Sequence, residues 1–422
     1  MMDSDNSQLY TFNSQPIPPG YKQTDAGVLP EDWEAHNLEN VCSMKSGESI
    51  TAARINEHTM YPCYGGNGLR GYTTRFTHDG EFALIGRQGA LCGNVVGVNG
   101  KFFASEHAIV VTPKEWIEIR FLTYVLSEMN LNRFSESSAQ PGLSVSKILK
   151  FPIAVPKNKT EQRAIATALS DVDALIESLD KLIAKKRNLK QAVMQELLTG
   201  KTRLPGFSED WVVKKLGDIC NYQNGKSLEK LFNNCDGFKV ISIGNYSPLG
   251  KFVVTDTFID KFYENIIAKF ILRKDELTMI LNDKTAVGTI IGRVLLIDES
   301  DKYVFNQRTM RLSPKINYSP LFLYFKINSE EIHNKIVELS KPGTQIYVNT
   351  NDIIDLELKI PLDYEEQTAI ATILSDMDAE IATLEARRAK TLDLKKGMMQ
   401  ELLTGKTRLV KPEVSHVTHP PL

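Results

Sequence analysis

The sequence predicts an α+β protein that is a pseudo-two-fold tandem repeat: two α/β globular domains joined by two long antiparallel coiled-coil helices. Three observations indicate this architecture. The segment 161–204 returns as 366–409 without a gap, and about 28 of its 44 positions are identical. Both copies carry apolar residues at the spacing of a coiled coil, and each copy follows a globular segment of similar length. Such a repeat defines the architecture before any single element is assigned.

The repeated segment is predicted to be a long helix with one narrow apolar stripe. Its apolar residues step alternately by four and three positions, which is the pattern of a coiled coil with a period near 3.5. They are Ile165, Leu169, Val172, Ile176, Leu179 and Ile183 in the first copy, and Ile370, Leu374, Met377, Ile381 and Leu384 in the second. A helix over 161–198 is roughly 55–60 Å long at 1.5 Å per residue. We expect the other copy to be its partner, and Gly200 and Gly405 to end the two helices.

The two globular domains begin and end with matching sequences. Glu-Asp-Trp ends at Trp33 in the first and at Trp211 in the second, and both domains finish on an apolar stretch followed by Pro156 or Pro361. The stretch from the tryptophan to the closing proline is 27 residues longer in the second domain. The predicted organisation is an N-terminal arm (1–28), a first globular domain (29–156), a first helix (157–203), a second globular domain (204–361), a second helix (362–409) and a flexible tail (410–422).

Each globular segment has the texture of short strands separated by turns. Residues 81–113 and 277–314 are rich in β-forming residues and are broken by glycine and Asn-Gly or Asp-Lys turns. Each run is followed by a helix candidate, near 115–129 and near 319–339. Both domains are therefore predicted to mix α and β structure.

Composition and charge narrow the classes of protein. Hydrophobic residues make up 42% and charged residues 24%, which is ordinary for a globular protein. No apolar run approaches a membrane span, and the polar N-terminus does not resemble a signal peptide, so we expect a cytoplasmic protein. The five cysteines are odd in number and widely spaced, which supports neither a disulfide framework nor a zinc site. A net charge of −2 is a caution against nucleic-acid binding by charge alone.

Motifs for catalysis are not convincing. Gly200-Lys201-Thr202 and its repeat at Gly405 imitate the end of a P-loop, but glutamine replaces the first glycine and the tripeptide follows a helix, not a strand. The sequence shows no amino-methyltransferase tetrapeptide, no GxGxxG after a strand and no HExxH, and His416 and His419 lie in the proline-ending tail. We expect no catalytic residue, no metal site and no cofactor in this chain.

These features together resemble the DNA specificity subunit of type I restriction–modification systems, over residues 29 to 409. The features are the pattern EQ-x-AIA-x-x-L-S-D-x-D-A, the ending MQELLTGKTRL, the apolar strand with its proline before each helix, and the Glu-Asp-Trp openings. The resemblance implies that each globular domain is a target-recognition domain that reads one half of a bipartite double-stranded DNA sequence. It implies that the helices form an antiparallel spacer and bind two methyltransferase (modification) subunits.

The resemblance also places the chemistry in the partners. Modification subunits of this family hold S-adenosylmethionine and methylate adenine N6, and up to two restriction subunits add translocation and cleavage that require ATP and Mg²⁺. The chain itself is then a non-catalytic subunit, and the missing cofactor motifs are expected.

Candidate DNA-contacting residues follow from residue type and from loops between strands. Arg and Lys contact guanine, Asn and Gln contact adenine, and Lys, Arg, Tyr and backbone N–H groups contact phosphates. The candidates are Tyr64, Asn67, Arg70, Tyr72, Arg75, Arg87 and Gln88 in the first domain, and Asn245, Tyr246, Lys284, Thr285, Arg293, Asn306, Gln307, Arg308, Gln345 and Tyr347 in the second. For each one, a role as a solvated loop side chain or a fold-stabilising hydrogen bond is an equal alternative.

Two other functions remain open from the sequence. A stand-alone bipartite DNA-binding protein, such as an operator-type repressor, would also carry two readers on a coiled coil, and it would not co-purify with a methyltransferase. An enzyme that cuts or methylates DNA by itself would be active as a purified single chain.

Overall fold

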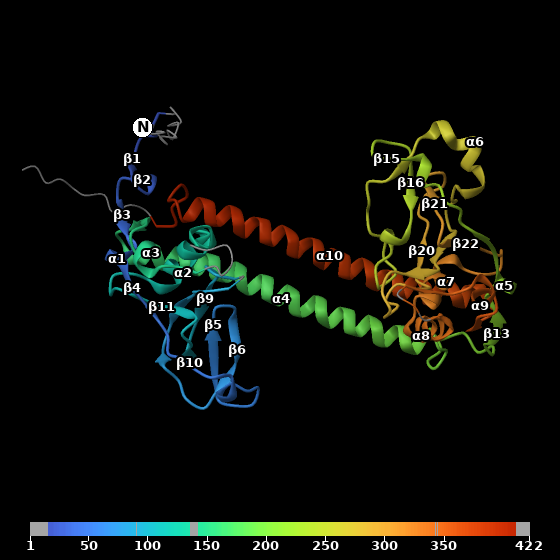
Figure 1. The fold of residues 1–422 in the computed structure, drawn as a ribbon, viewed down its shortest axis with the longest axis horizontal. Helices are drawn as coiled ribbons and strands as arrows, with labels where there is room; N and C mark the ends of the chain where they lie inside the picture. The colour runs from blue at the N-terminus through green and yellow to red at the C-terminus, as the bar shows by residue number, and fades with distance from the viewer. Residues whose placement is uncertain (1–15, 90, 136–141, 342, 344, 411–422) are drawn as a thin grey trace, which may run out of the picture. The chain divides into compact units, whose positions relative to one another are not determined.

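The computed structural model describes residues 16–410 except residues 90, 136–141, 342 and 344 (Figure 1). The chain divides into two compact units, which are described separately. Unit 1 contains the chain up to Leu179 and again from Arg387, and unit 2 contains Asp180–Ala386. The predicted tail from residue 411 onward, with His416 and His419, and the first 15 residues of the predicted arm lie outside the described residues.

Unit 1 contains two four-stranded sheets and two smaller ones. The sheet orders are β6-β5-β10-β7 and β4-β11-β8-β9, and the pairs are β1-β2 and β12-β3. The strands are β1 (Tyr21–Thr24), β2 (Gly27–Pro30), β3 (Trp33–Asn37), β4 (Cys42–Ser46), β5 (Tyr61–Gly65), β6 (Gly68–Thr73), β7 (His78–Asp79), β8 (Phe82–Gly86), β9 (Val95–Val98), β10 (Lys101–Ala104), β11 (Ala108–Pro113) and β12 (Pro152–Pro156). The helices are α1 (Leu38–Val41), α2 (Ile119–Glu128), α3 (Val145–Ile148) and the 3₁₀ turns η1 (Ala52–Arg54) and η2 (Leu131–Phe134).

Unit 2 repeats this plan. Its four-stranded sheets run β14-β22-β18-β20 and β15-β17-β16-β21, and its pairs are β13-β24 and β19-β23. The strands are β13 (Val212–Lys215), β14 (Cys220–Asn224), β15 (Phe232–Asn233), β16 (Phe238–Ile241), β17 (Phe258–Ile259), β18 (Leu277–Ile280), β19 (Asn282–Asp283), β20 (Val294–Leu296), β21 (Tyr303–Phe305), β22 (Thr309–Pro314), β23 (Ile346–Tyr347) and β24 (Glu357–Ile360). The helices are α5 (Leu216–Ile219), α6 (Glu264–Ile267), α7 (Pro320–Ile327), α8 (Glu330–Leu339), α9 (Thr350–Ile354) and the 3₁₀ turns η3 (Glu229–Leu231), η4 (Ile243–Asn245), η5 (Lys261–Tyr263) and η6 (Ala268–Phe270).

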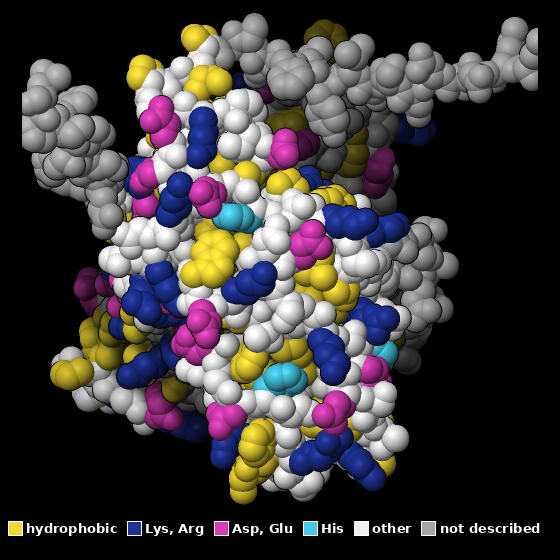
Figure 2. Space-filling view, turned by 90° about the vertical axis from the view of Figure 1, so that its left-hand side faces the viewer, with side chains coloured by type: hydrophobic (Ala, Val, Ile, Leu, Met, Phe, Trp, Pro, Cys, Tyr) yellow, Lys and Arg dark blue, Asp and Glu magenta, His cyan; other side chains and the backbone are white. Residues whose placement is uncertain are grey.

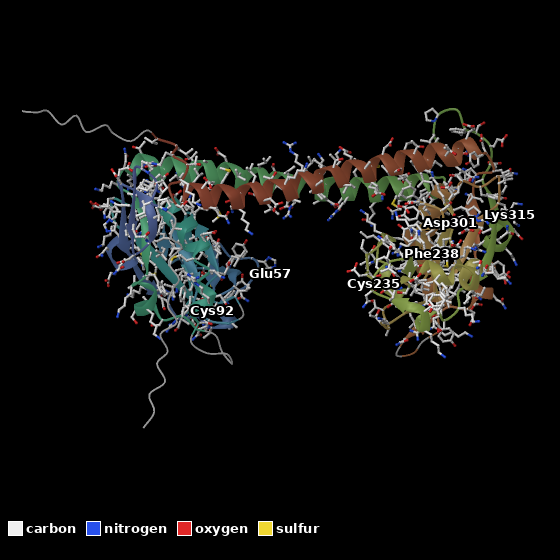
Figure 3. The ribbon with its side chains drawn as sticks, turned by 90° about the horizontal axis from the view of Figure 1, so that it is seen from above. Glu57, Cys92, Cys235, Phe238, Asp301 and Lys315 are labelled. Atoms are coloured by element: carbon white, nitrogen blue, oxygen red, sulfur yellow. The ribbon has the colours of Figure 1, made fainter. Side chains whose placement is uncertain are left out.

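The two long helices are α4 (Lys159–Leu197) and α10 (Tyr364–Leu402), which confirms the prediction of two repeated helices. They lie side by side and antiparallel within each unit (Figures 1 and 3). In unit 1 Lys395 Nζ lies 2.6 Å from Asp173 Oδ1, and in unit 2 Lys186 Nζ lies 2.6 Å from Glu380 Oε1. The predicted apolar seam is turned inward, because Ile165, Leu169, Leu179 and Ile183 are at most 5% exposed.

The ends of the long helices are part of each unit's core. In unit 1, Ile165 and Leu169 of α4 and Leu402 of α10 join one apolar cluster with Phe121 of α2. In unit 2, Leu197 of α4 and Leu374 of α10 join the corresponding cluster. Each globular domain is therefore packed onto the helix pair by buried apolar side chains, and burial of apolar surface is the dominant favourable term in such contacts.

Two expectations about helices can be compared directly. The helix expected near 115–129 is α2. The helix expected near 319–339 is two helices, α7 and α8, because Ser329 begins a new one: its hydroxyl accepts from the Ile332 backbone N–H at 3.4 Å. Both long helices are followed by a glycine in the left-handed region, Gly200 with φ 71° and Gly405 with φ 70°, as predicted.

The cysteine side chains are mostly inaccessible. Four cysteines, including Cys92, are buried, and Cys235 is exposed on the loop before β16 (Figure 3). Within the described part of the chain, no helix is both long and apolar enough to cross a membrane.

Candidate nucleic-acid interface

The turn between β5 and β6 is the first part of the candidate interface in unit 1. Gly66 and Asn67 connect the two strands, and the side chains of Asn67 and Arg70 are exposed. Among the described residues, neither side chain has a hydrogen-bond or ion-pair partner. Gly66 permits a close approach, because a Cβ there would lie 2.7 Å from the carbonyl oxygen of Gln88. The turn is therefore held beside the end of β8.

Arg87 and Gln88 follow β8 and meet a residue that sequence reasoning missed, His107. The Arg87 backbone N–H donates to the His107 carbonyl oxygen at 2.9 Å, and Gln88 Oε1 lies 3.2 Å from His107 Nδ1. Arg87 Nη1 donates to Ser46 Oγ at 3.2 Å. The structure thus brings the β5–β6 turn, the end of β8 and the β10–β11 connection together as one polar surface.

The other three candidates of unit 1 also contribute to the fold. Arg75 pairs with Glu48 at 2.8 Å, and its guanidinium carbon lies 4.7 Å from the centre of the Phe103 ring. Tyr64 is half-buried and makes an edge contact with Phe102, and burial raises the pKa of its hydroxyl. Tyr72 is half-buried on β6. The Arg75 side chain is 50% exposed, so part of it remains accessible.

In unit 2, a two-residue strand pairing gathers candidates from distant parts of the sequence. β19 pairs with β23 through Asn282 opposite Tyr347, which places Lys284 and Thr285 beside Gln345 and Tyr347. These four side chains are exposed. The neighbouring carboxylate, Asp283, accepts from the Thr285 and Ile290 backbone N–H groups at 2.8 Å each. Asp283 also accepts from the Thr285 hydroxyl at 2.9 Å. Asp283 therefore fixes the loop, beside which Lys284, Gln345 and Tyr347 are exposed.

Arg308 joins the same surface. The Leu281 backbone N–H donates to the Arg308 carbonyl oxygen at 2.9 Å, and the Val348 N–H donates to the Leu281 carbonyl oxygen at 3.0 Å. Arg308 is exposed and has φ 65°, an unusual conformation for a residue with a side chain. Non-glycine residues with positive φ are concentrated at turns and functional sites.

Four candidates of unit 2 lie inside the domain. Asn245, Tyr246, Arg293 and Asn306 are at most 8% exposed. Asn245 holds its own loop by accepting from the Ser242 N–H and donating to the Val253 carbonyl, both at 2.9 Å. Arg293 Nη1 donates to the Asn328 carbonyl at 2.6 Å. These contacts stabilise the fold, so the exposed candidates carry the proposal made below.

Gln307 and Asn306 share one carboxylate partner. Gln307 Nε2 lies 2.5 Å and Asn306 Nδ2 lies 3.1 Å from Glu229 Oε1. Hydrogen bonds, the largest effect coming from Ser227, lower the pKa of Glu229 to about 2. The carboxylate is therefore charged at neutral pH and holds the Gln307 side chain.

The two candidate surfaces share one structurally equivalent position. The Arg87 backbone N–H donates to the His107 carbonyl oxygen in unit 1, and the Leu281 N–H donates to the Arg308 carbonyl oxygen in unit 2. The accepting residue lies directly before β11 in unit 1 and directly before β22 in unit 2. His107 thus occupies the position that Arg308 occupies in the other repeat. Aligning the two domains residue by residue before these strands would have indicated His107.

Figure 2 shows one end face of the molecule, on which Lys and Arg side chains lie among Asp and Glu side chains.

Comparison with known proteins gives a consistent result. The family model described as type I restriction modification DNA specificity domain matches residues 30–185 and 208–393. The specificity subunit of the Methanocaldococcus jannaschii type I restriction enzyme MjaVIII is 27% identical over 416 residues, covering 92% of this chain and 96% of that protein. The specificity subunit of the Escherichia coli enzyme EcoprrI is 44% identical over 146 residues, and the match spans 34% of this chain and 36% of that protein.

Solved structures share the fold. The crystal structure of a type I restriction–modification S subunit from M. genitalium aligns with TM-score 0.62 at 17% identity, covering 88% of this chain and 96% of the other. A chain from a structural study of complex assembly in a type I R-M system aligns with TM-score 0.53 at 14% identity, covering 90% and 99%.

Proposed function

This chain belongs to the family of type I restriction–modification DNA specificity subunits, and from that premise we propose that it reads a bipartite DNA target and directs adenine-N6 methylation by partner subunits. Each unit reads one half of the target. With restriction subunits added, the same reading directs ATP-dependent cleavage.

One observation carries the reading role: in each unit, accessible side chains that match base edges are brought together from separate segments. In unit 1 these are the exposed Asn67 and Arg70 and the half-buried Gln88 and His107. In unit 2 they are the exposed Lys284, Thr285, Arg308, Gln345 and Tyr347. Arg and Lys suit the acceptors of guanine, and Asn and Gln suit the paired donor and acceptor of adenine. Strands and short turns hold the backbone beneath them, which favours recognition by a preformed surface.

The repeated helices support the proposal of two modification subunits. Both copies end in the same eleven residues, MQELLTGKTRL, so an equivalent docking surface is present twice. Two equivalent surfaces related by pseudo-two-fold symmetry bind two copies of one partner. S-adenosylmethionine, and ATP with Mg²⁺, are then bound by the partners, and this chain contributes no catalytic group.

Reconstitution tests this proposal. Purified chain is combined with its modification subunits, and the assembly is weighed by native mass spectrometry and assayed for methyl transfer to DNA. We expect two modification subunits per chain, methylation of a bipartite motif by the complex, and none by the chain alone. Methylation by the isolated chain, or a stable complex with a single modification subunit, would overturn the proposal.

A domain exchange tests the assignment of one half-site to each unit. Replacing residues 29–156 with the corresponding domain of another such subunit should change one half of the methylated motif and leave the other half unchanged. A change in both halves, while two modification subunits remain bound, would contradict the two-reader model.

A further inference from the structure

Unit 1 contains a cavity of about 410 Å³ where its target domain meets the long helices. Its wall includes Gly97 of β9, Thr123 and Ser127 of α2, Asp173 of α4 and Lys395 of α10. Tyr124 contributes its hydroxyl, which donates to Asp173 Oδ2 at 2.7 Å. The cavity is open, and it is lined by polar and apolar groups in similar measure.

The repeat allows each wall position to be found in unit 2. Gln162 Oε1 accepts from the Glu118 N–H, and Gln367 Oε1 accepts from the Ser319 N–H, both at 2.8 Å, which aligns α2 with α7. The wall residues Gly97, Thr123, Ser127, Asp173 and Lys395 then correspond to Leu296, Tyr324, Asn328, Asp378 and Lys190. The carboxylate pairing is also shared, since Lys190 pairs with Asp378 as Lys395 pairs with Asp173.

In unit 2 the corresponding place is filled by the protein itself. The Tyr324 hydroxyl donates to the Gly250 carbonyl oxygen at 3.2 Å, and Lys251 Nζ lies 3.9 Å from Asp378 Oδ1. A Cβ on Gly250 would lie 2.4 Å from Asn328 Nδ2, so the turn packs tightly against that side chain. The Gly250-Lys251 turn of unit 2 thus contacts the residues that correspond to three wall positions of the unit 1 cavity.

The difference in domain length explains why only unit 2 fills this place. The turn belongs to residues 242–257, which connect β16 to β17. The equivalent strands of unit 1, β5 and β6, are connected by Gly66 and Asn67 alone. Unit 1 also has smaller wall residues, because Gly97 stands for Leu296 and Thr123 stands for Tyr324.

We propose that the cavity of unit 1 binds a turn of the modification subunit that carries a glycine and a neighbouring basic residue. This inference rests on the proposed function, because it names the place where that partner docks. Asp173 is 40% exposed and holds one cation, as Asp378 does, and Asp378 also attracts the second cation Lys251. The other cation of the wall, Arg120, lies 3.6 Å from Glu118, a carboxylate that it shares with Arg163.

The geometry also describes the rest of the occupant. The space of a leucine and a tyrosine ring is missing from the wall of unit 1, so the turn should bring an apolar side chain next to its basic one. Polypeptide fills the corresponding place in the other repeat, which favours a protein segment over a small ligand. Docking at unit 1 therefore uses a contact that docking at unit 2 does not need.

Filling the cavity with the residues of the other repeat tests the proposal. The variant combines Gly97→Leu and Thr123→Tyr. A Cβ at Gly97 would lie 3.6 Å from Thr123 Cγ2, which is an ordinary van der Waals contact, so the backbone there accepts a side chain without a clash. We expect one modification subunit to bind as in the unchanged chain and the second to bind roughly tenfold more weakly or worse. The control is Ile316→Tyr, which adds a ring at a side chain that is 94% exposed outside the cavity. Binding is followed by native mass spectrometry over a titration, with thermal unfolding as a check that the variant folds.

The outcomes separate the two proposals. If the unchanged chain binds no modification subunits, the proposed function fails and the docking inference fails with it. If it binds two and the filled variant binds two with equal affinity, the docking inference alone fails. Weaker binding by the control as much as by the filled variant would also overturn it.

A photocross-linking experiment identifies the occupant directly. p-Benzoylphenylalanine is incorporated in place of Ser127, and the complex is irradiated and digested. We expect a cross-linked peptide of the modification subunit that contains glycine next to lysine or arginine. Cross-links only to this chain's own terminal segments, or to no partner peptide, would overturn the inference.

Discussion

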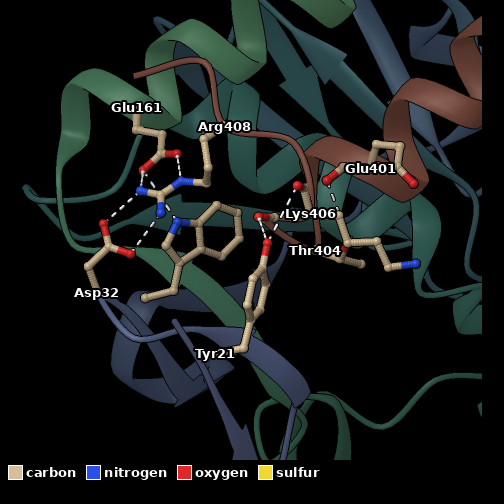
Figure 4. A network of polar contacts seen from close by, with 9 residues as sticks. Tyr21, Asp32, Glu161, Glu401, Thr404, Lys406 and Arg408 are labelled. Carbon is tan, nitrogen blue, oxygen red and sulfur yellow. Dashed lines mark hydrogen bonds and ion pairs between the residues drawn. The ribbon is translucent and has the colours of Figure 1, made fainter. Parts of the chain in front are cut away.

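Arg408 and Glu161, which are 247 residues apart in the chain, form a bidentate ion pair in unit 1 (Figure 4). Arg408 Nε lies 2.5 Å from Glu161 Oε1, and Nη2 lies 2.8 Å from Oε2. The Glu161 side chain is 3% exposed, and it also accepts from Trp33 Nε1 at 3.3 Å. Arg408 extends to Asp32 as well, with contacts of 2.8 and 2.6 Å. The end of the second repeat therefore completes the domain that the first residues begin.

Unit 2 contains the same arrangement with a different connection. Arg203 binds Glu366 at 2.7 and 2.8 Å, and Trp211 Nε1 donates to Glu366 at 3.2 Å. Arg203 and Trp211 are joined by a short covalent segment, whereas Arg408 and Trp33 lie near opposite ends of the sequence. In unit 2 a short covalent segment keeps Arg203 near Trp211. In unit 1 the non-covalent contacts of Arg408 hold the corresponding parts together.

We predict that Arg408→Ala destabilises unit 1 by about 3–5 kcal/mol, because it leaves the charge of Glu161 buried without a partner. Urea unfolding, followed by hydrogen exchange in β3 and at the start of α4, measures the loss. The matched control is Arg54→Ala at an exposed residue. An unfolding midpoint within error of the control would contradict the prediction.

A second substitution identifies the cause. Adding Glu161→Gln to Arg408→Ala replaces the unpaired carboxylate with a neutral amide that still accepts from Trp33. The double variant should therefore be more stable than Arg408→Ala alone. If both variants unfold together, the buried charge is not the origin of the loss.

The repeat and its periodicity predicted the architecture, because both are local properties of the sequence. A period of 3.5 over Ile165 to Ile183 defines a helix and its buried face without knowledge of anything else. The break between α7 and α8 was not predictable in this way. It coincides with Asn328, whose side chain accepts from the Val294 N–H at 3.0 Å and donates to its carbonyl oxygen at 2.9 Å. That contact spans 34 residues of sequence.

Residue type alone selected the candidates, and it did not tell which of their side chains are exposed. Lys284 and Gln345 are exposed in the structure, whereas Asn245 and Asn306 have the same kind of polar side chain turned inward. The sequence does not distinguish an asparagine that hydrogen-bonds to a loop backbone from one whose side chain is free to contact a base. His107 was missed because the list of base-contacting residue types does not lead to histidine.

We predict that Arg308→Ala weakens recognition at one half-site only. A bidentate contact of arginine with guanine contributes about 1–3 kcal/mol of discrimination, which is roughly 5- to 150-fold in relative methylation. Methylome sequencing of a host that carries the variant complex measures both halves of the motif at once, so the half-site read by unit 1 is the internal control. Equal relaxation of both halves would contradict the assignment of Arg308 to one reader. His107→Ala should affect the other half.

We predict a pH-dependent stability of unit 2 that originates at His333. Burial, and next the nearby Arg293, lower the pKa of its imidazole from the ordinary value of 6.5. Below pH 6.5 the unfolded chain takes up a proton that the folded chain resists, so stability decreases as the pH falls from 6.5 toward the folded-state pKa. Thermal unfolding between pH 7.5 and pH 5 should show a smaller decrease for His333→Asn than for the unchanged chain. An identical decrease in both would contradict this origin.

We predict that the length of the helix pair defines the gap between the two half-sites. The two long helices run antiparallel within each unit, so a matched insertion must enter both of them. Duplicating residues 179–185 in α4 and 384–390 in α10 adds one heptad to each at corresponding positions of the repeat and keeps the apolar seam continuous. A heptad adds about 10 Å of helix, which corresponds to about three base pairs at 3.4 Å per step. Methylome sequencing should then show unchanged half-sites separated by a longer gap.

The control places the same heptad in α4 alone. It should disrupt pairing with α10 and abolish methylation, because α4 is then one heptad longer than its partner. A methylated motif with the original gap after the double insertion would contradict the prediction, because the length of the helix pair would then not define the distance between the two half-sites.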